Sequence, residues 1–212
     1  MFRYLASQTK TNICCHVDHG YTLDECYEGI DSGFTSVMFD GSKLTLKENI
    51  KISKKIASRA HKYNISIEGE IGFVGYDNGK ISEGTNIEDA VTFANKSNID
   101  AMAISVGNTH LQTSKKASID FNKINLIEAK TKIPLVLHGS SGIPVEQRKK
   151  LARKTKVAKL NIGTEIRMTF GEALRKNLKK NPKTYDRLQL LKPTIKDLTK
   201  VTKKIIKQIG PN

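Results

Sequence analysis

The chain has 212 residues, 38% of them hydrophobic, and a formal net charge of +15 at pH 7. This length fits one domain with a sizeable core, and no apolar run is long enough to span a membrane. The segment Met1-Phe-Arg-Tyr-Leu lacks the apolar stretch of a signal peptide, so we expect a cytoplasmic protein without a membrane partner.

The three cysteines are Cys14, Cys15 and Cys26. Their number is odd and their spacing is not the C-x-x-C of a metal site. Cys14 and Cys15 fall in a predicted strand. We therefore expect them to be reduced core residues.

The positive charge is concentrated in the C-terminal part of the chain. After Glu146 the sequence holds 20 of the 36 Lys+Arg but only 4 of the 21 Asp+Glu. These lysines follow helical patterns at 173–180 and 196–208, and no nucleic-acid recognition motif accompanies them. We expect a solvated lysine-rich face and no specific nucleic-acid partner. Weak polyanion binding with a steep salt dependence is the alternative.

Short apolar segments alternate with segments of helical periodicity along the chain. The predicted strands are residues 12–17, 34–39, 65–71, 100–106, 134–137 and 158–162. The predicted helices are residues 22–32, 45–63, 87–97, 122–131 and 145–154, followed by two or three lysine-rich helices broken at Pro182 and Pro193. Thr22 and Glu25 have the spacing of a capping box at a helix N-terminus.

This alternation occurs six times with apolar strands, which predicts a parallel sheet with helical crossovers. Polar residues follow nearly every predicted strand, which favours a TIM-type (β/α) barrel with its site at the C-terminal ends of the strands. An open doubly wound sheet is the alternative, and it would gather ligands at one switch point instead. The predicted domain covers residues 1–212, with its C-terminal helices beginning at about 166.

Three histidines follow three different predicted strands: His19, His110 and His138. Imidazoles from three directions leave tetrahedral Zn²⁺ one open position, as in a catalytic site. Such a metal acts as a Lewis acid on a carbonyl oxygen. Asp18, next to His19, is suited to acid–base work beside that metal.

Two segments predict backbone anion sites. The strand 134–137 ends on His138 and runs into Gly139, Ser140, Ser141 and Gly142, a turn in which N–H groups can approach an anion. Asn161, Gly163 and Thr164 follow the last predicted strand and lead into a helix N-terminus. Barrels most often hold phosphate after their final two strands. Metal, base and phosphate cradle together indicate an enzyme acting on a phosphorylated carbonyl compound.

The motifs of this chain resemble those of the class II, metal-dependent fructose-bisphosphate and tagatose-bisphosphate aldolases. The matching segments are His16-Val-Asp-His-Gly20, Ser36-Val-Met-Phe-Asp-Gly-Ser42, Ile67-Glu-Gly-Glu-Ile-Gly72, Asp100 to Gly107 with Thr109-His110, Leu135-Val-Leu-His-Gly-Ser-Ser-Gly142, Asn161-Ile-Gly-Thr-Glu165 and Asn181 to Asp186. Their order, spacing and number make the resemblance specific over almost the whole chain.

The resemblance implies zinc-dependent, reversible aldol cleavage of fructose or tagatose 1,6-bisphosphate to dihydroxyacetone phosphate and glyceraldehyde 3-phosphate. It implies a homo-oligomer, dimer or tetramer, and a monovalent cation near the phosphate. The residue roles that it implies are Zn²⁺ ligands at His19, His110 and His138, proton transfer with the C4 hydroxyl at Asp18, dihydroxyacetone phosphate binding at Gly139 to Gly142 and Asn161 to Thr164, and supporting or second-cation positions at Asp40 and Glu70.

The chain departs from the family pattern at several points. Six strand–helix units are present where the family barrel has eight, and the first two are lacking. Leu111 stands where the family usually has glycine, and Gly163 where several members carry Asp, Asn or Ala. Asp77 is only a weak candidate for the acidic residue of the mobile loop. We therefore expect this chain alone to be weakly active or inactive, and self-associating through exposed sheet edges or marginally stable.

Two functions from other classes stay open at this point. A truncated, inactive or regulatory aldolase homologue would keep the site residues without turnover, and a polyanion-binding protein would use the basic C-terminal part. The residues alone do not separate fructose from tagatose bisphosphate, which differ at one stereocentre. The remaining histidines, His16 and His61, are expected to be structural.

Overall fold

The structure is a computed structural model that describes residues 2–76, 79 and 82–210. Two compact units divide the chain. Unit 1 comprises residues 1–73, 82–106 and 120–136, and unit 2 comprises residues 74–81, 107–119 and 137–212.

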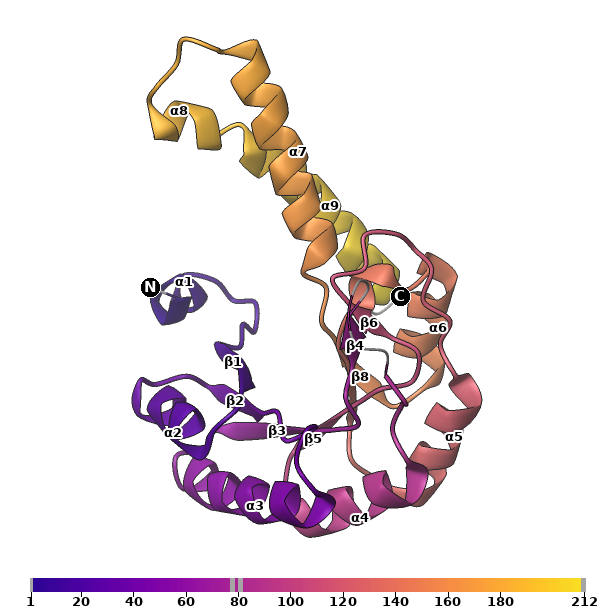
Figure 1. Ribbon diagram of the computed structural model, residues 1–212. Helices are drawn as coiled ribbons and strands as arrows, with labels where there is room; N and C mark the ends of the chain where they lie inside the picture. The colour runs from indigo at the N-terminus through magenta and orange to yellow at the C-terminus, as the bar shows by residue number, and fades with distance from the viewer. Residues whose placement is uncertain (1, 77–78, 80–81, 211–212) are drawn as a thin grey trace. The chain divides into compact units, whose positions relative to one another are not determined.

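Figure 1 labels most of the helices and strands along the chain. The helices are α1 Phe2–Ser7, α2 Leu23–Asp31, α3 Leu46–Lys62, α4 Ile87–Ser97, α5 Phe121–Lys130, α6 Val145–Lys154, α7 Thr164–Lys180, α8 Arg187–Leu191 and α9 Thr194–Ile209, with a 3₁₀ helix η1 at Ser140–Gly142. The strands are β1 His16–Gly20, β2 Ser36–Phe39, β3 Ser66–Ile71, β4 Gly75–Tyr76, β5 Ala101–Ile104, β6 Thr109–His110, β7 Leu135–Leu137 and β8 Val157–Leu160.

The main sheet has six strands in the order β1-β2-β3-β5-β7-β8, and a second sheet pairs β4 with β6. The pairs β1–β2, β2–β3, β3–β5 and β5–β7 are parallel. A helix follows each of the six strands before the next begins. The predicted alternation and the parallel sheet are therefore confirmed.

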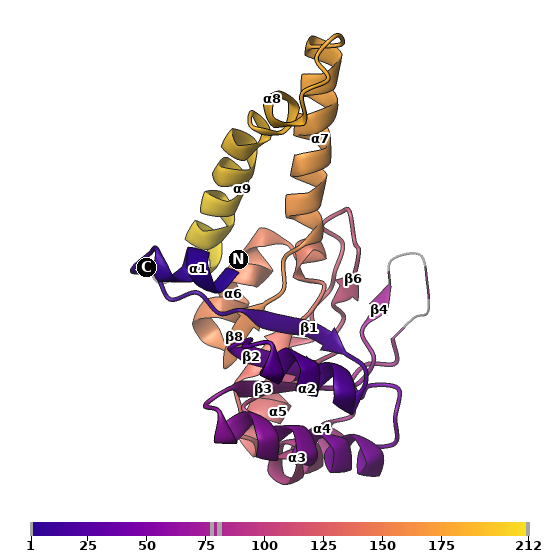
Figure 2. The ribbon, with the colours of Figure 1, turned by 90° about the vertical axis from the view of Figure 1, so that its left-hand side faces the viewer.

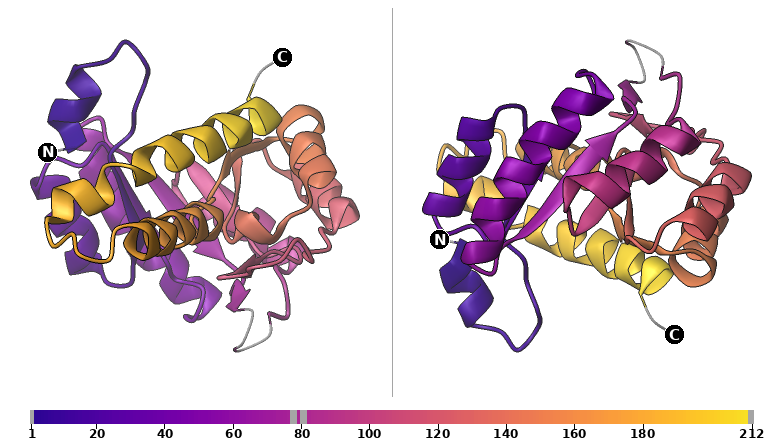
Figure 3. Two further views of the ribbon diagram at one scale, coloured as in Figure 1. Left: turned by 90° about the horizontal axis from the view of Figure 1, so that it is seen from above. Right: turned by 90° about the horizontal axis from the view of Figure 1, so that it is seen from below.

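In unit 1 the helices α2 to α5 lie along one side of the strands (Figure 3). Gly69 on β3 faces this side, because a Cβ there would lie 2.8 Å from the ring of Phe93 on α4. Glu68 and Glu70 alternate with Gly69 and therefore point to the opposite side of the sheet. Both carboxylates are buried, so β3 carries an apolar face toward the helices and an acidic face toward the interior.

Helix α2 begins directly after β1 because its start is specified locally. Thr22 is the N-cap, its side chain accepts from the amide of Glu25, and the Glu25 carboxylate accepts from the amide of Thr22. This is the predicted capping box. Thr45 and Glu48 cap α3 in the same way.

The first strand differs from its prediction. Residues 12–15 precede it, and β1 instead runs from His16 to Gly20. The pairing with β2 shifts register between Val17 and Gly20, where His19 has φ 62°. Sequence periodicity does not reveal such a bulge, because the extra residue breaks the alternation that marks a strand.

The expectation that Cys14 and Cys15 are core residues is wrong for both. Cys14 is exposed and Cys15 is half-buried, because both precede β1, whereas Cys26 is buried on α2. All three are free thiols. Burial raises the pKa of the Cys26 thiol to about 12, with a smaller contribution from Glu25.

In unit 2, α7 and α9 run side by side and α8 lies at the far end of this hairpin (Figure 2). Pro182 follows α7 and Pro193 separates α8 from α9, as the sequence predicts. No residue of α7 or α8 is buried, while α9 buries Thr194, Ile205 and Gln208. Among the residues that the structure describes, no helix is both long and apolar enough to cross a bilayer.

Candidate active site

The bulge in β1 presents His19 to two carboxylates of unit 1. His19 Nδ1 lies 2.9 Å from Asp40 Oδ2 and 3.8 Å from Glu70 Oε2. Asp40 is itself held in place, since its Oδ1 accepts from the amide and the hydroxyl of Ser42 at 3.1 and 2.6 Å. A carboxylate on Nδ1 fixes the imidazole tautomer and leaves Nε2 as the donor atom for a metal.

The charge of Asp40 suits this role. Burial alone would raise the pKa of its carboxyl, but the hydrogen bonds with His19 and Ser42 lower that pKa below its ordinary value. Asp40 is therefore ionised at neutral pH and accepts the Nδ1 proton. Glu70 is fixed from its backbone, where the buried Asn49 donates Nδ2 to the Glu70 carbonyl at 2.8 Å.

His19, Asp40 and Glu70 form a group that could hold a cation. Each offers one ligand atom, and these atoms lie within 4.8 Å of one another. One nitrogen and two carboxylate oxygens suit Zn²⁺ or a similar divalent ion. The donor set of unit 1 therefore fits a metal.

Two further predicted ligands come together in unit 2. The rings of His110 on β6 and His138 after β7 lie edge to face with centroids 5.8 Å apart. His138 is fully buried, and Asn108 donates Nδ2 to its carbonyl at 3.0 Å. Tyr76 on β4 stacks on His110 with centroids 5.0 Å apart. Two buried or half-buried imidazoles in contact are chemistry typical of a metal centre.

Leu111 follows His110 in the left-handed region, with φ 57°. This conformation costs a side-chain-bearing residue about 1–2 kcal/mol and is normally left to glycine. The glycine that the family usually has at this position would adopt the same conformation without that cost. Leu111 is 53% exposed, so packing contributes little to holding it there.

The turn after His138 is built from Gly139 and η1. Gly139 has φ 61°, and a Cβ there would lie 2.3 Å from the Thr109 carbonyl. Ser140 donates its amide to the Asn161 carbonyl at 3.0 Å, and the amide of Gly142 donates to Gly139 at 3.3 Å. The two predicted anion segments are therefore joined, but two of the turn's amides are already used within the protein.

Sequence reasoning missed a polar cluster beside this turn. Arg148 on α6, Lys115 in the loop after β6, and Glu165 in the first turn of α7 are mutually bonded through the Glu165 carboxylate, at 2.6 Å from each cation. In the sequence, Arg148 is one of many basic residues after Glu146, so it is expected to be exposed like the lysines around it. Only its 0% exposure distinguishes it, and no periodicity signal reveals that.

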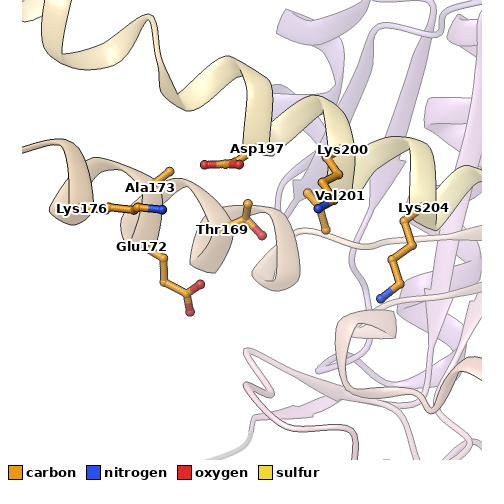
Figure 4. Close-up of a pocket in the computed structure, with 8 residues that line it drawn as sticks. All are labelled: Thr169, Glu172, Ala173, Lys176, Asp197, Lys200, Val201 and Lys204. Atoms are coloured by element: carbon orange, nitrogen blue, oxygen red, sulfur yellow. The ribbon is translucent and has the colours of Figure 1, made fainter.

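Two cavities of unit 2 lie at this end of the helical hairpin. The smaller, of about 190 Å³, is lined by Gln112, Thr113, Lys115, Ser141, Glu165, Met168, Thr169, Glu172 and Val201. The larger, of about 390 Å³, is an open groove between α7 and α9 lined by Thr169, Glu172, Ala173, Lys176, Asp197, Lys200, Val201 and Lys204 (Figure 4). Only the smaller cavity includes a predicted phosphate-binding residue, Ser141.

The remaining predicted residues are placed as follows. Asp18 is exposed on β1, beside the bulge. Gly163 precedes α7 and Thr164 begins it. Asp77, the weak candidate for the loop acid, lies outside the described residues. The histidines expected to be structural bond elsewhere: His16 Nδ1 lies 2.9 Å from Ser36 Oγ, and His61 Nε2 lies 3.0 Å from Asp100 Oδ2.

Comparison with known proteins then decides the family. The model of the fructose-bisphosphate aldolase class-II family matches residues 1–212. The chain belongs to this family. The predicted resemblance is thereby confirmed.

Relatives within the family carry more than one name. The chain is 36% identical over 201 residues to a 6-phospho-5-dehydro-2-deoxy-D-gluconate aldolase of Shouchella clausii, covering 93% of this chain and 68% of that protein. It is 34% identical over 185 residues to a fructose-bisphosphate aldolase of Geobacillus stearothermophilus, covering 85% of this chain and 64% of that protein. An aldolase is thus established, whereas the bisphosphate substrate is not.

Solved structures agree on the architecture. The YdjI aldolase of Escherichia coli K12 superposes with a TM-score of 0.83 at 26% identity, covering 98% of this chain and 72% of that one. Fructose-bisphosphate aldolase of Campylobacter jejuni gives a TM-score of 0.76 at 21% identity, covering 98% and 72%, which supports the fold alone. The predicted incomplete TIM-type (β/α) barrel is confirmed.

Proposed function

We propose that this class II aldolase cleaves a phosphorylated ketose and releases dihydroxyacetone phosphate. The observation that carries the proposal is the family match over the whole chain, together with the metal-type donors at His19, His110 and His138. The first substrate class is a ketose 1,6-bisphosphate, fructose or tagatose, with glyceraldehyde 3-phosphate as the second product.

A second substrate is favoured by the name shared by several relatives, 6-phospho-5-dehydro-2-deoxy-D-gluconate aldolase. That compound has a ketone next to the phosphorylated carbon and a hydroxyl two carbons beyond the ketone, as a ketose bisphosphate does. Cleavage of the bond between that hydroxyl-bearing carbon and the carbon next to the ketone releases dihydroxyacetone phosphate in both cases. The two substrates differ in the part that becomes the aldehyde product. In the gluconate this part ends in a carboxylate next to a carbon without a hydroxyl, and in a ketose bisphosphate it ends in a phosphate next to a hydroxyl-bearing carbon.

We propose that His19, His110 and His138 together hold the metal, with Zn²⁺ as the ion that this donor set suits. When bound, Zn²⁺ supplies Lewis-acid polarisation of the substrate's ketone oxygen. Asp40 fixes the ring of His19 through Nδ1, and Glu70 adds negative charge beside it. We assign Asp40 and Glu70 this supporting role, or that of ligands to a second cation.

Asp18 is the proposed acid–base residue. Its carboxylate takes the proton from the hydroxyl of the carbon that becomes the aldehyde. The electron pair of the breaking C–C bond then passes into the phosphorylated three-carbon fragment. This fragment takes up a proton at the carbon that was bonded to the new aldehyde carbon. An exposed carboxylate beside a metal ligand can accept and return such a proton without a ligand role of its own.

The phosphate is assigned to Gly139 to Gly142 together with Asn161, Gly163 and Thr164, with a monovalent cation nearby. These segments are joined by the bond from the Ser140 amide to the Asn161 carbonyl. Thr164 begins α7, and the N-terminus of a helix favours a phosphate. We further propose a cytoplasmic homo-oligomer that has neither a specific nucleic-acid partner nor a membrane partner.

The test is an aldol cleavage assay on the 212-residue chain with added Zn²⁺ and three substrates: fructose 1,6-bisphosphate, tagatose 1,6-bisphosphate and 6-phospho-5-dehydro-2-deoxy-D-gluconate. Release of dihydroxyacetone phosphate from at least one of them is expected, and its loss with chelator. No release from any substrate at saturating Zn²⁺ would favour the inactive or regulatory homologue instead.

A further inference from the structure

The side chain of Arg148 is 0% exposed, which is rare for a charged residue. Its Nε donates to the Ser140 carbonyl at 3.1 Å, and its Nη2 donates to the Ser141 carbonyl at 2.8 Å and to Glu165 at 2.6 Å. One guanidinium thus grips two successive carbonyls of η1. It also ties them to the first turn of α7.

Lys115 reaches the same turn from the loop after β6. Its Nζ donates to the Ser141 carbonyl at 2.9 Å and to the Glu165 carboxylate at 2.6 Å. Glu165 in turn donates its amide to Ser141 Oγ at 3.2 Å. Three segments of unit 2, far apart in sequence, therefore converge on the backbone of two serines.

The hydrogen bonds to the Ser140 and Ser141 carbonyls also fix the direction of the neighbouring backbone amides. The carbonyl of Ser140 and the amide of Ser141 belong to one planar trans peptide group, so they point in opposite directions. With the Ser140 carbonyl held toward Arg148, the Ser141 amide faces away from the guanidinium. Arg148 thus fixes the orientation of the Ser141 amide from the side opposite to a ligand bound at this turn.

We infer that Arg148, acting with Lys115 and Glu165, is a positioning residue that holds the Ser140–Ser141 turn in the orientation that receives the substrate's phosphate. This inference rests on the proposed function. The cluster has two cations and one carboxylate, so its net charge of about +1 also favours a phosphate dianion at the turn.

A purely structural role explains the burial less well. A buried ion pair costs much of its Coulombic gain in desolvation, and an apolar side chain of similar volume often gives equal or greater stability. Within the part of the chain that the structure describes, Arg148 Nη1 is also buried without a hydrogen-bond partner. An arginine with one unbonded nitrogen is explained if its planar guanidinium is needed to position the Ser140 and Ser141 carbonyls.

The experiment uses the 212-residue chain and three variants. Arg148→Lys keeps the positive charge but loses the planar guanidinium. Lys115→Met removes the second hydrogen-bond donor to the Ser141 carbonyl at a partly exposed position. Lys149→Met, at an exposed position on α6 next to Arg148, is the control. Two readouts are taken: hydrogen exchange of the Gly142 and Ile143 amides by NMR, and affinity for glycerol 3-phosphate by calorimetry. Zinc content is measured for each protein.

For Arg148→Lys we expect exchange at these amides to quicken and phosphate affinity to fall about tenfold, a loss of 1.4 kcal/mol. Lys115→Met should show the same changes more weakly, while zinc content and the control stay as in the parent. Unchanged exchange in both variants would overturn the inference. So would quickened exchange with unchanged phosphate affinity.

Failure of the proposed function gives a different result. If the parent chain binds neither glycerol 3-phosphate nor inorganic phosphate, the phosphate site itself is wrong and the role of Arg148 at it is overturned as well. If the parent binds phosphate but cleaves none of the three substrates, the reaction is wrong while the positioning role is upheld by the two readouts.

Discussion

His19 and Leu111 hold left-handed backbone at the ends of two strands, with φ 62° and 57°. Asn64 and Asn98 share this conformation, but asparagine adopts it at little cost. Strain at non-glycine residues gathers at functional sites, where the surroundings hold the backbone in place. At His19 the conformation belongs to the bulge that brings the imidazole to Asp40. At Leu111 it follows directly on His110.

Leu111→Gly tests the strain directly. Glycine adopts positive φ freely and little packing is lost, so we expect the free energy of unfolding to rise by about 1 kcal/mol. Urea denaturation measures it. Asn98→Gly is the matched control and should change stability by no more than a few tenths of a kcal/mol. A Leu111→Gly variant less stable than the parent would show that the side chain contributes packing that outweighs its strain.

Asp18→Ala separates proton transfer from metal binding. If Asp18 moves the substrate proton and is not a ligand, cleavage should fall about 100-fold or more while bound zinc is retained. Steady-state kinetics and elemental analysis on the same preparation check this. Loss of zinc together with activity would instead make Asp18 part of the support for the metal.

His138→Ala tests the metal assignment. Removing one of three imidazoles from a zinc site should remove most of the metal, which we expect at about one Zn²⁺ per chain in protein purified without chelator. His61→Ala, on a surface histidine bonded to Asp100, is the control and should keep it. Unchanged zinc content in His138→Ala would contradict the ligand role.

Glu165 in the first turn of α7 accepts hydrogen bonds from Arg148 on α6 and from Lys115. Burial alone would raise the pKa of this carboxyl, but hydrogen bonds from Lys115 and Arg148 lower it below its ordinary value. A group with a lowered pKa in the folded state stabilises the fold above its unfolded pKa, and this contribution is lost as the pH falls through the folded value. The junction should therefore be weakened by acid.

Glu165→Gln is expected to lower the free energy of unfolding by about 2 kcal/mol at pH 7, because charge-assisted bonds to Arg148 and Lys115 become neutral ones. The difference from the parent should shrink as the pH falls below about 4.3, the ordinary pKa of glutamate. Glu146→Gln, at an exposed pair with Lys149, should show no more than about 0.5 kcal/mol at any pH. A pH-independent effect of Glu165→Gln would rule out the charge as its cause. Chemical denaturation at several pH values measures both.

Across the whole molecule, the helical hairpin of unit 2 offers the clearest surface for self-association. Its exposed apolar residues include Tyr185 at 96%, Leu188 at 69% and Ile195 at 60% exposure. Exposed apolar side chains that gather in one patch mark interaction sites, and these three lie close together in sequence. The sheet edge at β1 is less suited to pairing than the sequence suggests, since residues 12–15 form no strand and β1 is bulged.

We therefore expect residues 1–212 to self-associate through α8 and its flanks, with a sedimentation coefficient that rises with concentration. Leu188→Glu should shift the population toward monomer without changing the thermal unfolding of the remaining fold. Leu126→Glu, at an exposed leucine on α5 in unit 1, is the control and should have no effect on association. A parent chain that stays monomeric at all concentrations would contradict this expectation.

The repeating architecture could be predicted from the amino-acid sequence alone. Apolar runs and helical periodicity placed α3, α4 and α6 within a residue of their observed bounds, and Thr22 with Glu25 predicted the start of α2. These features are local, because the periodicity and the caps that encode them lie within one element. The motif order likewise indicated the family that the comparisons confirm.

Which side chains come into contact, and whether they are buried, depends on the packing of the folded chain. No local sequence pattern predicts the bulge at His19, the hydrogen bond between Asp40 and His19 Nδ1, or the burial of Arg148. All three depend on neighbours that are distant in sequence. The prediction that Cys14 is buried was wrong for the same reason, since burial depends on what packs around a residue. A sequence fixes its own periodicity, whereas contacts between strand ends are settled by the register of the sheet.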